Sequence, residues 1–89
     1  MESKRIIEKD KQKIVEVVGW TGTALILIAY FLVSFELIEP GSATFQLLNL
    51  SGAFGILIIS LYKKVYQTVV TNTFWMIIAI VALIQIILK

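Results

Sequence analysis

The chain has 89 residues, enough for one domain, of which 58% are hydrophobic and 16% are charged, with a net charge of +2. A soluble domain of this size cannot hide so much apolar surface, because small domains bury only about 60% of the surface that the unfolded chain exposes. The composition therefore predicts an integral membrane protein. It also excludes disulfides, thiolate metal sites and histidine chemistry, because cysteine and histidine are both absent.

Residues 1–13 carry most of the charge of the chain, with five basic and three acidic side chains. Apolar residues recur in this segment about two turns apart, as Ile6, Ile7 and Ile14, which indicates a weakly amphipathic helix. Two interpretations stay open: a solvated cytoplasmic tail that leads into the first span, or an interfacial helix that lies on anionic lipid. The segment has no clustered basic face, so we expect no nucleic-acid partner.

Three long apolar segments follow the charged tail. The central part of each is uncharged over about 20 residues, the length that an α-helix needs to cross the hydrocarbon core. They predict membrane spans at about residues 14–38, 43–62 and 65–88. Pro40 and Gly41 end the first span, and the pair Lys63-Lys64 forms a short hinge between the second and third. The predicted fold is therefore all-α, with three transmembrane helices and short connections.

The distribution of lysine and arginine sets the expected orientation. Short basic flanks remain on the cytoplasmic side of a membrane, and here the tail and the Lys63-Lys64 hinge carry nearly all of the positive charge. Three spans place these two segments on the same side, as the rule requires. We therefore expect a multi-pass protein of the inner (cytoplasmic) membrane, with its N-terminus in the cytoplasm and its C-terminus outside.

Polar and small residues gather on one face of each predicted span. On the first span they include Trp20, Thr23, Tyr30 and Ser34; on the second, Gln46, Asn49, Ala53 and Ser60; on the third, Thr68, Asn72, Trp75, Ala79 and Ala82. The opposite faces, rich in Leu, Ile, Val and Phe, are expected to meet lipid. Asn72 raises the central question, because an unpaired amide in hydrocarbon costs roughly 2–7 kcal/mol.

Two interpretations of these polar faces stay open. In the first, they only pack helices together, since small residues allow close approach and amides form interhelical hydrogen bonds worth about 0.6 kcal/mol each. In the second, they line a cavity that holds a polar solute. Asn72 and Asn49 would then hydrogen-bond the solute, and Trp75 would stack on it. Gln46 or Tyr30 would gate the path.

Three helices do not easily enclose a solute path alone, so a transporter of this size is expected to form a twofold homodimer of six helices. Four glycines offer close-approach surfaces for helix packing in such a dimer: Gly19, Gly22, Gly52 and Gly55. No charged residue lies in the central part of a span, which argues against coupling to protons or sodium. The sequence shows no catalytic, metal-binding or cofactor motif, so we expect neither enzyme activity nor a cofactor.

Val18-Gly19-Trp20 opens the first span, and Val69-Val70-Thr71-Asn72 follows the hinge. In this order the chain resembles the SemiSWEET half-transporters of the PQ-loop family over about residues 17–88. The resemblance implies that Asn72 contacts the solute, because the third helix of those proteins carries a solute-binding Asn at a comparable position. The chain is still more similar to a family of small uncharacterised bacterial three-helix membrane proteins, through Gly19-Trp20, Asn49-Leu50-Ser51-Gly52 and Leu61-Tyr62-Lys63.

The function expected from the sequence is that of a homodimeric passive transporter of a small polar metabolite or sugar across the lipid bilayer. The alternative is a non-transporting membrane subunit that packs against itself or against another membrane protein. The two differ in the surroundings of Asn72 and Asn49, which face a wet cavity in the first case and a closed helix seam in the second.

Overall fold

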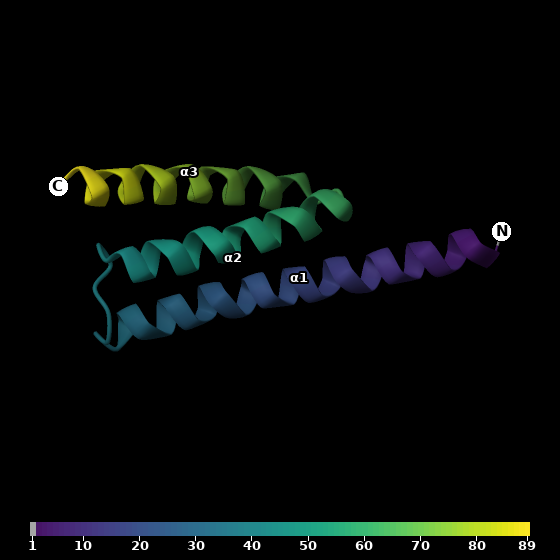
Figure 1. Cartoon of the computed structure of the whole chain (residues 1–89), viewed down its shortest axis with the longest axis horizontal. Helices are drawn as coiled ribbons and strands as arrows, with labels where there is room; N and C mark the ends of the chain where they lie inside the picture. Colours follow the sequence, from purple (N-terminus) through teal and green to yellow (C-terminus); the bar gives the residue numbers. More distant parts are fainter. Residues whose placement is uncertain (1) are drawn as a thin grey trace.

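The computed structural model describes residues 2–89 and is all-helical over that range, apart from two short connections. Helix α1 spans Glu2–Ser34, α2 spans Ala43–Tyr62 and α3 spans Tyr66–Leu88 (Figure 1). Each helix is long and apolar enough to cross a membrane, which confirms the predicted fold class. Met1, the first residue of the predicted tail, lies outside the described residues.

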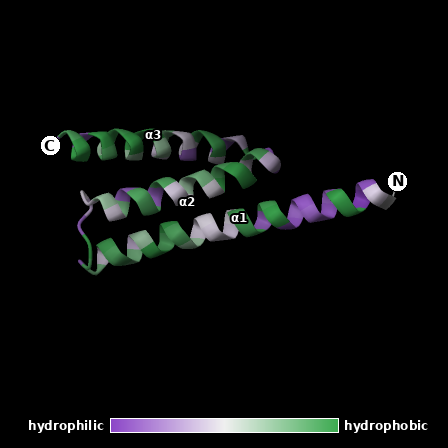
Figure 2. Cartoon of the chain, in the orientation of Figure 1, coloured by the Kyte–Doolittle hydropathy of each residue, from purple (hydrophilic) through white to green (hydrophobic). Residues whose placement is uncertain are grey.

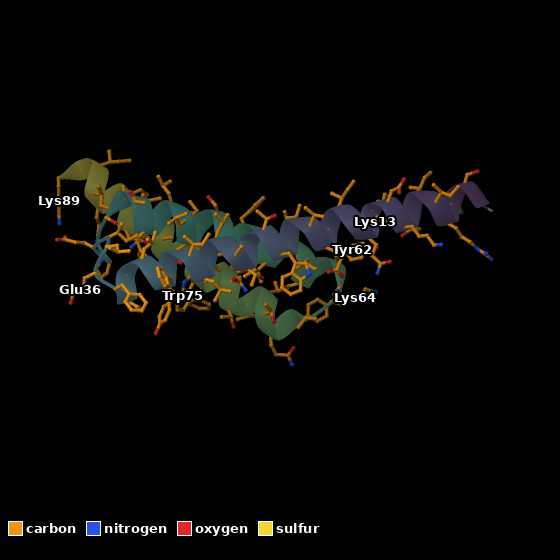
Figure 3. The ribbon with its side chains drawn as sticks, turned by 90° about the horizontal axis from the view of Figure 1, so that it is seen from below. Lys13, Glu36, Tyr62, Lys64, Trp75 and Lys89 are labelled. Carbon is orange, nitrogen blue, oxygen red and sulfur yellow. The ribbon has the colours of Figure 1, made fainter. Side chains whose placement is uncertain are left out.

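Helix α2 lies between α1 and α3 and packs against both (Figure 1). Over the described residues, no Cα atom of α1 comes within 8 Å of a Cα atom of α3. The three helices therefore form an open row, which we call the layer, rather than a closed bundle. Because α3 is inclined to α1 (Figure 3), the layer is not flat, and its principal dimensions are 55 × 23 × 22 Å. Helices α1 and α3 cover two sides of α2, and the surface of α2 between them is not covered by either helix.

Helix α1 is about 50 Å long at 1.5 Å per residue, whereas the hydrocarbon core of a bilayer is about 30 Å thick. Its first turns contain the charge-rich segment 3–13 and extend beyond the α2–α3 hinge (Figure 1). Figure 2 shows that hydrophilic residues concentrate in this extension, while the rest of the layer is mainly hydrophobic. The charged segment is thus continuous with the first span as a single helix.

Small residues form the whole buried core. The only buried hydrophobic side chains among the described residues are alanines, Ala29, Ala53 and Ala79. A Cβ added at Gly22 would lie 2.5 Å from the carbonyl oxygen of Gly52, and one at Gly55 would lie 2.8 Å from a carbonyl of α1. The backbones of α1 and α2 therefore touch directly. The sequence analysis places these glycines at a dimer interface; here they pack two helices of the same chain.

Both connections begin with the same helix-ending motif. After α1, the Leu37 N–H donates to the Leu32 carbonyl at 2.8 Å, and Glu36 adopts a left-handed φ of 59°. The α2–α3 hinge repeats this arrangement, with Lys64 also at φ 59°. A left-handed residue bridged by such a hydrogen bond is a Schellman motif, in which glycine is the usual residue. This turn ends α1 four residues before the predicted limit of the first span at residue 38.

Candidate functional site

A groove between α2 and α3 brings together three of the five predicted site residues. Gln46, Asn49 and Trp75 line it, and its volume is about 170 Å³. Its remaining lining residues are Phe45, Ile78 and Ala79. The walls are therefore apolar and aromatic, with two carboxamides and no charged group, which is the usual composition of a site for a small uncharged ligand.

The Asn49 side chain is the least satisfied polar group in this groove. Asn49 is only 8% exposed, and its carboxamide makes no hydrogen bond to any described residue. Every fully enclosed side-chain nitrogen or oxygen among the described residues has a hydrogen-bond partner. Because the amide atoms of Asn49 have none, they are not fully enclosed and reach open space in the groove. In an apolar surrounding, such an amide is stabilised only when a second molecule supplies the missing hydrogen bonds.

Gln46 and Trp75 flank this amide. The Gln46 Nε2 atom donates to the Pro40 carbonyl at 3.3 Å, which ties the α1–α2 connection to the first turns of α2. Trp75 is half exposed and lies nearer to the Glu36 end of the layer than to the Lys64 end (Figure 3). Its indole thus offers an open face beside the groove, and Gln46 forms part of the rim.

Asn72, the residue that the sequence singles out, lies outside the groove. It is 8% exposed, and its Nδ2 atom donates to the Thr68 carbonyl at 3.0 Å, one turn back in α3. Its own helix therefore supplies a hydrogen bond to the amide. Spacing alone does not separate Asn72 from Asn49, because both are amides on apolar helices; the difference depends on the rotamer of each side chain.

Tyr30 is also apart from the groove. It lies on α1 and is 71% exposed. No groove residue comes from α1. Tyr30 therefore does not line the Asn49 groove, although it follows Thr23 of α1 by seven residues and shares that residue's side of the helix.

A second groove opens on the same side of the layer. It lies between α1 and α2, is lined by Trp20, Thr23 and Ile56 among others, and has a volume of about 280 Å³. Ile56 follows Asn49 by seven residues, and residues seven apart share one side of a helix. Both grooves therefore open on the uncovered surface of α2 between α1 and α3, which we call the open side. Both tryptophans of the chain line this side.

An ion pair borders the open side at the hinge end. The Lys63 Nζ atom lies 2.6 Å from the Glu16 Oε1 atom, and both residues line the second groove. The pair connects α1 to the α2–α3 hinge. The amino-acid sequence does not reveal this pair, because residues 47 positions apart have no local signature of contact; the basic hinge is the one available signal.

Comparison with known proteins bears on the fold more than on the chemistry. A family model matches residues 15–89. The chain belongs to that family. It is a small family of uncharacterised function, so membership does not assign an activity to the grooves. No curated protein and no solved structure matches the chain, and these comparisons give no support to a relationship with the PQ-loop family.

The family match begins within α1, at residue 15, and includes all residues of both grooves. The match therefore covers all of α2 and α3 and the apolar part of α1, whereas the charged extension before residue 15 lies outside it. Among the described residues, no cluster of three or more metal-ligating side chains is present. What the open side offers chemically is hydrogen bonding by an amide and stacking by indoles, both of which suit binding of a neutral molecule.

Proposed function

We propose that this protein is a homodimeric passive transporter of a small, polar, uncharged metabolite, and that the Asn49 groove holds the solute. The supporting observation is the Asn49 carboxamide, which is about nine-tenths buried and has no hydrogen-bond partner among the described residues. An amide offers one acceptor and two donors, which match the hydroxyl or amide groups of such a metabolite. Charged solutes are disfavoured because no opposite charge lines the groove.

The open side supports the dimer. Two copies that face each other through their open sides would surround a twofold axis with six helices. Each groove alone, about 170 Å³, corresponds to roughly five or six water molecules at about 30 Å³ each. Two facing grooves would reach the lower end of the usual range for ligand sites, about 300–1,000 Å³. The partner copy would also bring its Tyr30 toward the shared space.

In this proposal each residue has a distinct task. Asn49 hydrogen-bonds the solute, Trp75 stacks on it, and Gln46 closes the rim. Asn72 packs α3 against α2 rather than touching the solute, since its amide already has a partner in its own helix. The dimer lies in the inner membrane with its N-terminus in the cytoplasm, and it has no enzyme activity and needs no cofactor.

A second candidate function rests on the same open side. The partner that covers it would be another membrane protein, and the chain would be a non-transporting subunit. The Asn72 hydrogen bond within α3 supports this candidate in part, because one of the two buried asparagines has a partner in its own helix.

Uptake into proteoliposomes tests the proposal. Neutral polyols, amides and sugars are offered to vesicles that contain the full chain, and the same assay is run with Asn49→Leu, which keeps the side-chain size but removes the amide. Gln85→Leu is the matched control, because it removes an exposed amide of α3. Transport predicts that Asn49→Leu abolishes uptake without weakening the dimer, whereas Gln85→Leu leaves both unchanged. Uptake of no solute, or equal uptake by the Asn49 variant, would contradict the proposal.

A further inference from the structure

The charged extension of α1 overhangs the end of α2 and forms a basic groove there. Its lining consists of Lys4, Arg5, Glu8, Lys9, Gln12 and Tyr62, and its volume is about 340 Å³. Three of these side chains are basic and one is acidic. Tyr62 is the last residue of α2, next to the Lys63-Lys64 hinge (Figure 3). The groove therefore lies where a membrane-spanning helix ends and the headgroup region begins.

An apolar groove continues along the same two helices toward the membrane interior. It is lined by Val17, Val18, Thr21, Gly22 and Leu25 of α1 and by Ser51, Phe54, Gly55 and Ile58 of α2, and its volume is about 310 Å³. Gly22 and Gly55 lack side chains at the point where the helices touch. The hollow beside them is open to the surroundings, because Val17 and Phe54 are both more than half exposed.

The apolar groove lies on the face of the layer opposite the open side. Ser51 follows Asn49 by two residues, and Ile58 follows Ile56 by two. Two residues correspond to about 200° around α2 at 100° per residue. In a dimer that pairs through the open sides, this opposite face would remain in contact with lipid. The groove is thus available to a lipid whether or not the proposed transport occurs.

The basic and apolar grooves are next to each other along α2. Ile58 and Tyr62 are four residues apart and adjoin on one face of α2. On α1, Gln12 of the basic groove precedes Val17 of the apolar groove by about 7.5 Å of helix axis and about 140° around the helix. A phospholipid has the same arrangement, with a phosphate beside its glycerol and an acyl chain below it. Lysine, arginine and a tyrosine hydroxyl can all donate hydrogen bonds to phosphate oxygens.

From this arrangement we infer that the crease between α1 and α2 binds one anionic phospholipid, with its phosphate in the basic groove and one acyl chain in the apolar groove. A zwitterionic lipid would fit the apolar part but would bring a positive group to the basic part. An acidic protein segment would match the charges but would leave the apolar part empty. With the N-terminus in the cytoplasm, the bound lipid belongs to the cytoplasmic leaflet.

Native mass spectrometry of the full chain, released from detergent micelles doped with phosphatidylglycerol or phosphatidylcholine, tests the headgroup. We expect retention of phosphatidylglycerol in preference to phosphatidylcholine. Replacing Arg5 and Lys9 by Gln should weaken phosphatidylglycerol binding by about tenfold or more, since each basic group near a membrane surface contributes substantially to anionic lipid affinity. Replacing Lys13 and Lys64 by Gln removes the same charge from residues that line neither groove and should change binding less than about threefold.

The acyl-chain part is tested separately. Ser51→Phe fills the apolar groove and should lower retention of both lipids, whereas Ile77→Phe adds a ring to an exposed position of α3 and should not. Glycerol phosphate, which lacks acyl chains, should fail to compete with the lipid. Equal losses for the two double variants would show diffuse charge attraction and overturn the site, as would equal binding of the two lipids or effective competition by glycerol phosphate. Circular dichroism of each variant confirms that the helices are retained.

Discussion

The direct backbone contact between α1 and α2 yields the sharpest stability prediction. Replacing Gly22 by Ala places a methyl group where its Cβ would lie 2.5 Å from the Gly52 carbonyl oxygen and 3.0 Å from a backbone nitrogen of α2. Ordinary van der Waals contact begins at 3.4 Å, so the helices must separate by almost 1 Å. Because the obstructing atoms are backbone rather than a flexible side chain, the strain cannot be relieved by a rotamer change.

We expect Gly22→Ala to lower the free energy of unfolding by about 1–3 kcal/mol, the usual cost of overpacking. This net loss would occur although Ala has the higher helix propensity, by about 1 kcal/mol. Gly19→Ala should cost less, because the three atoms nearest to its Cβ would all belong to the Ile59 side chain rather than to backbone. Gly41→Ala is the control, since nothing lies within 4 Å of that position.

The assay is reversible unfolding in mixed micelles, followed by helical circular dichroism at several protein concentrations. If Gly22 packs within one chain, its effect should not depend on protein concentration. A loss of stability that grows on dilution would instead place Gly22 at a dimer interface, and wild-type stability for Gly22→Ala would refute the close backbone contact.

Three further predictions concern the hinge, the ion pair and the two amides. Lys64→Gly should stabilise the fold by about 1 kcal/mol relative to Lys64→Ala, because glycine adopts the left-handed backbone at φ 59° without strain; equal unfolding midpoints for the two variants would contradict this. Glu16→Gln should cost at most about 1 kcal/mol, since the pair with Lys63 is partly exposed, and a double-mutant cycle with Lys63→Gln measures the coupling. Asn72→Leu should retain solute uptake in the assay that Asn49→Leu abolishes; the reverse result would move the solute site to Asn72.

Much of the architecture can be predicted from the sequence because charge and turn residues mark the helix ends. The predicted spans at 43–62 and 65–88 agree closely with α2 and α3. The end of α1 was placed too late, because Phe35, Leu37 and Ile38 are apolar and continue the hydrophobic pattern. The chain reverses there through a left-handed Glu36, which no residue preference signals, since glycine is the residue expected at that position.

The arrangement of the helices in space could not be predicted. Glycine pairs three residues apart occur on both α1 and α2, and the pattern does not say whether they meet each other or a second copy. For the same reason the sequence singles out Asn72 and does not show that Asn49 is the amide without a hydrogen-bond partner. The packing order, with α2 in the middle, places Asn49 in a groove, and the rotamer of Asn72 directs its amide to a carbonyl of its own helix.

The composition of the core shows how the three helices associate and what the Asn49 groove lacks. The buried residues are three alanines, two asparagines, one serine and several glycines. In water, their burial would supply almost no hydrophobic stabilisation. In a bilayer, helices associate instead through close packing and hydrogen bonds, and the α1–α2 contact satisfies the first requirement. Lipid chains can cover apolar surface but cannot hydrogen-bond an amide. Lipid therefore cannot supply the hydrogen bonds that the Asn49 amide lacks, and a solute, a second copy of the chain or water must supply them.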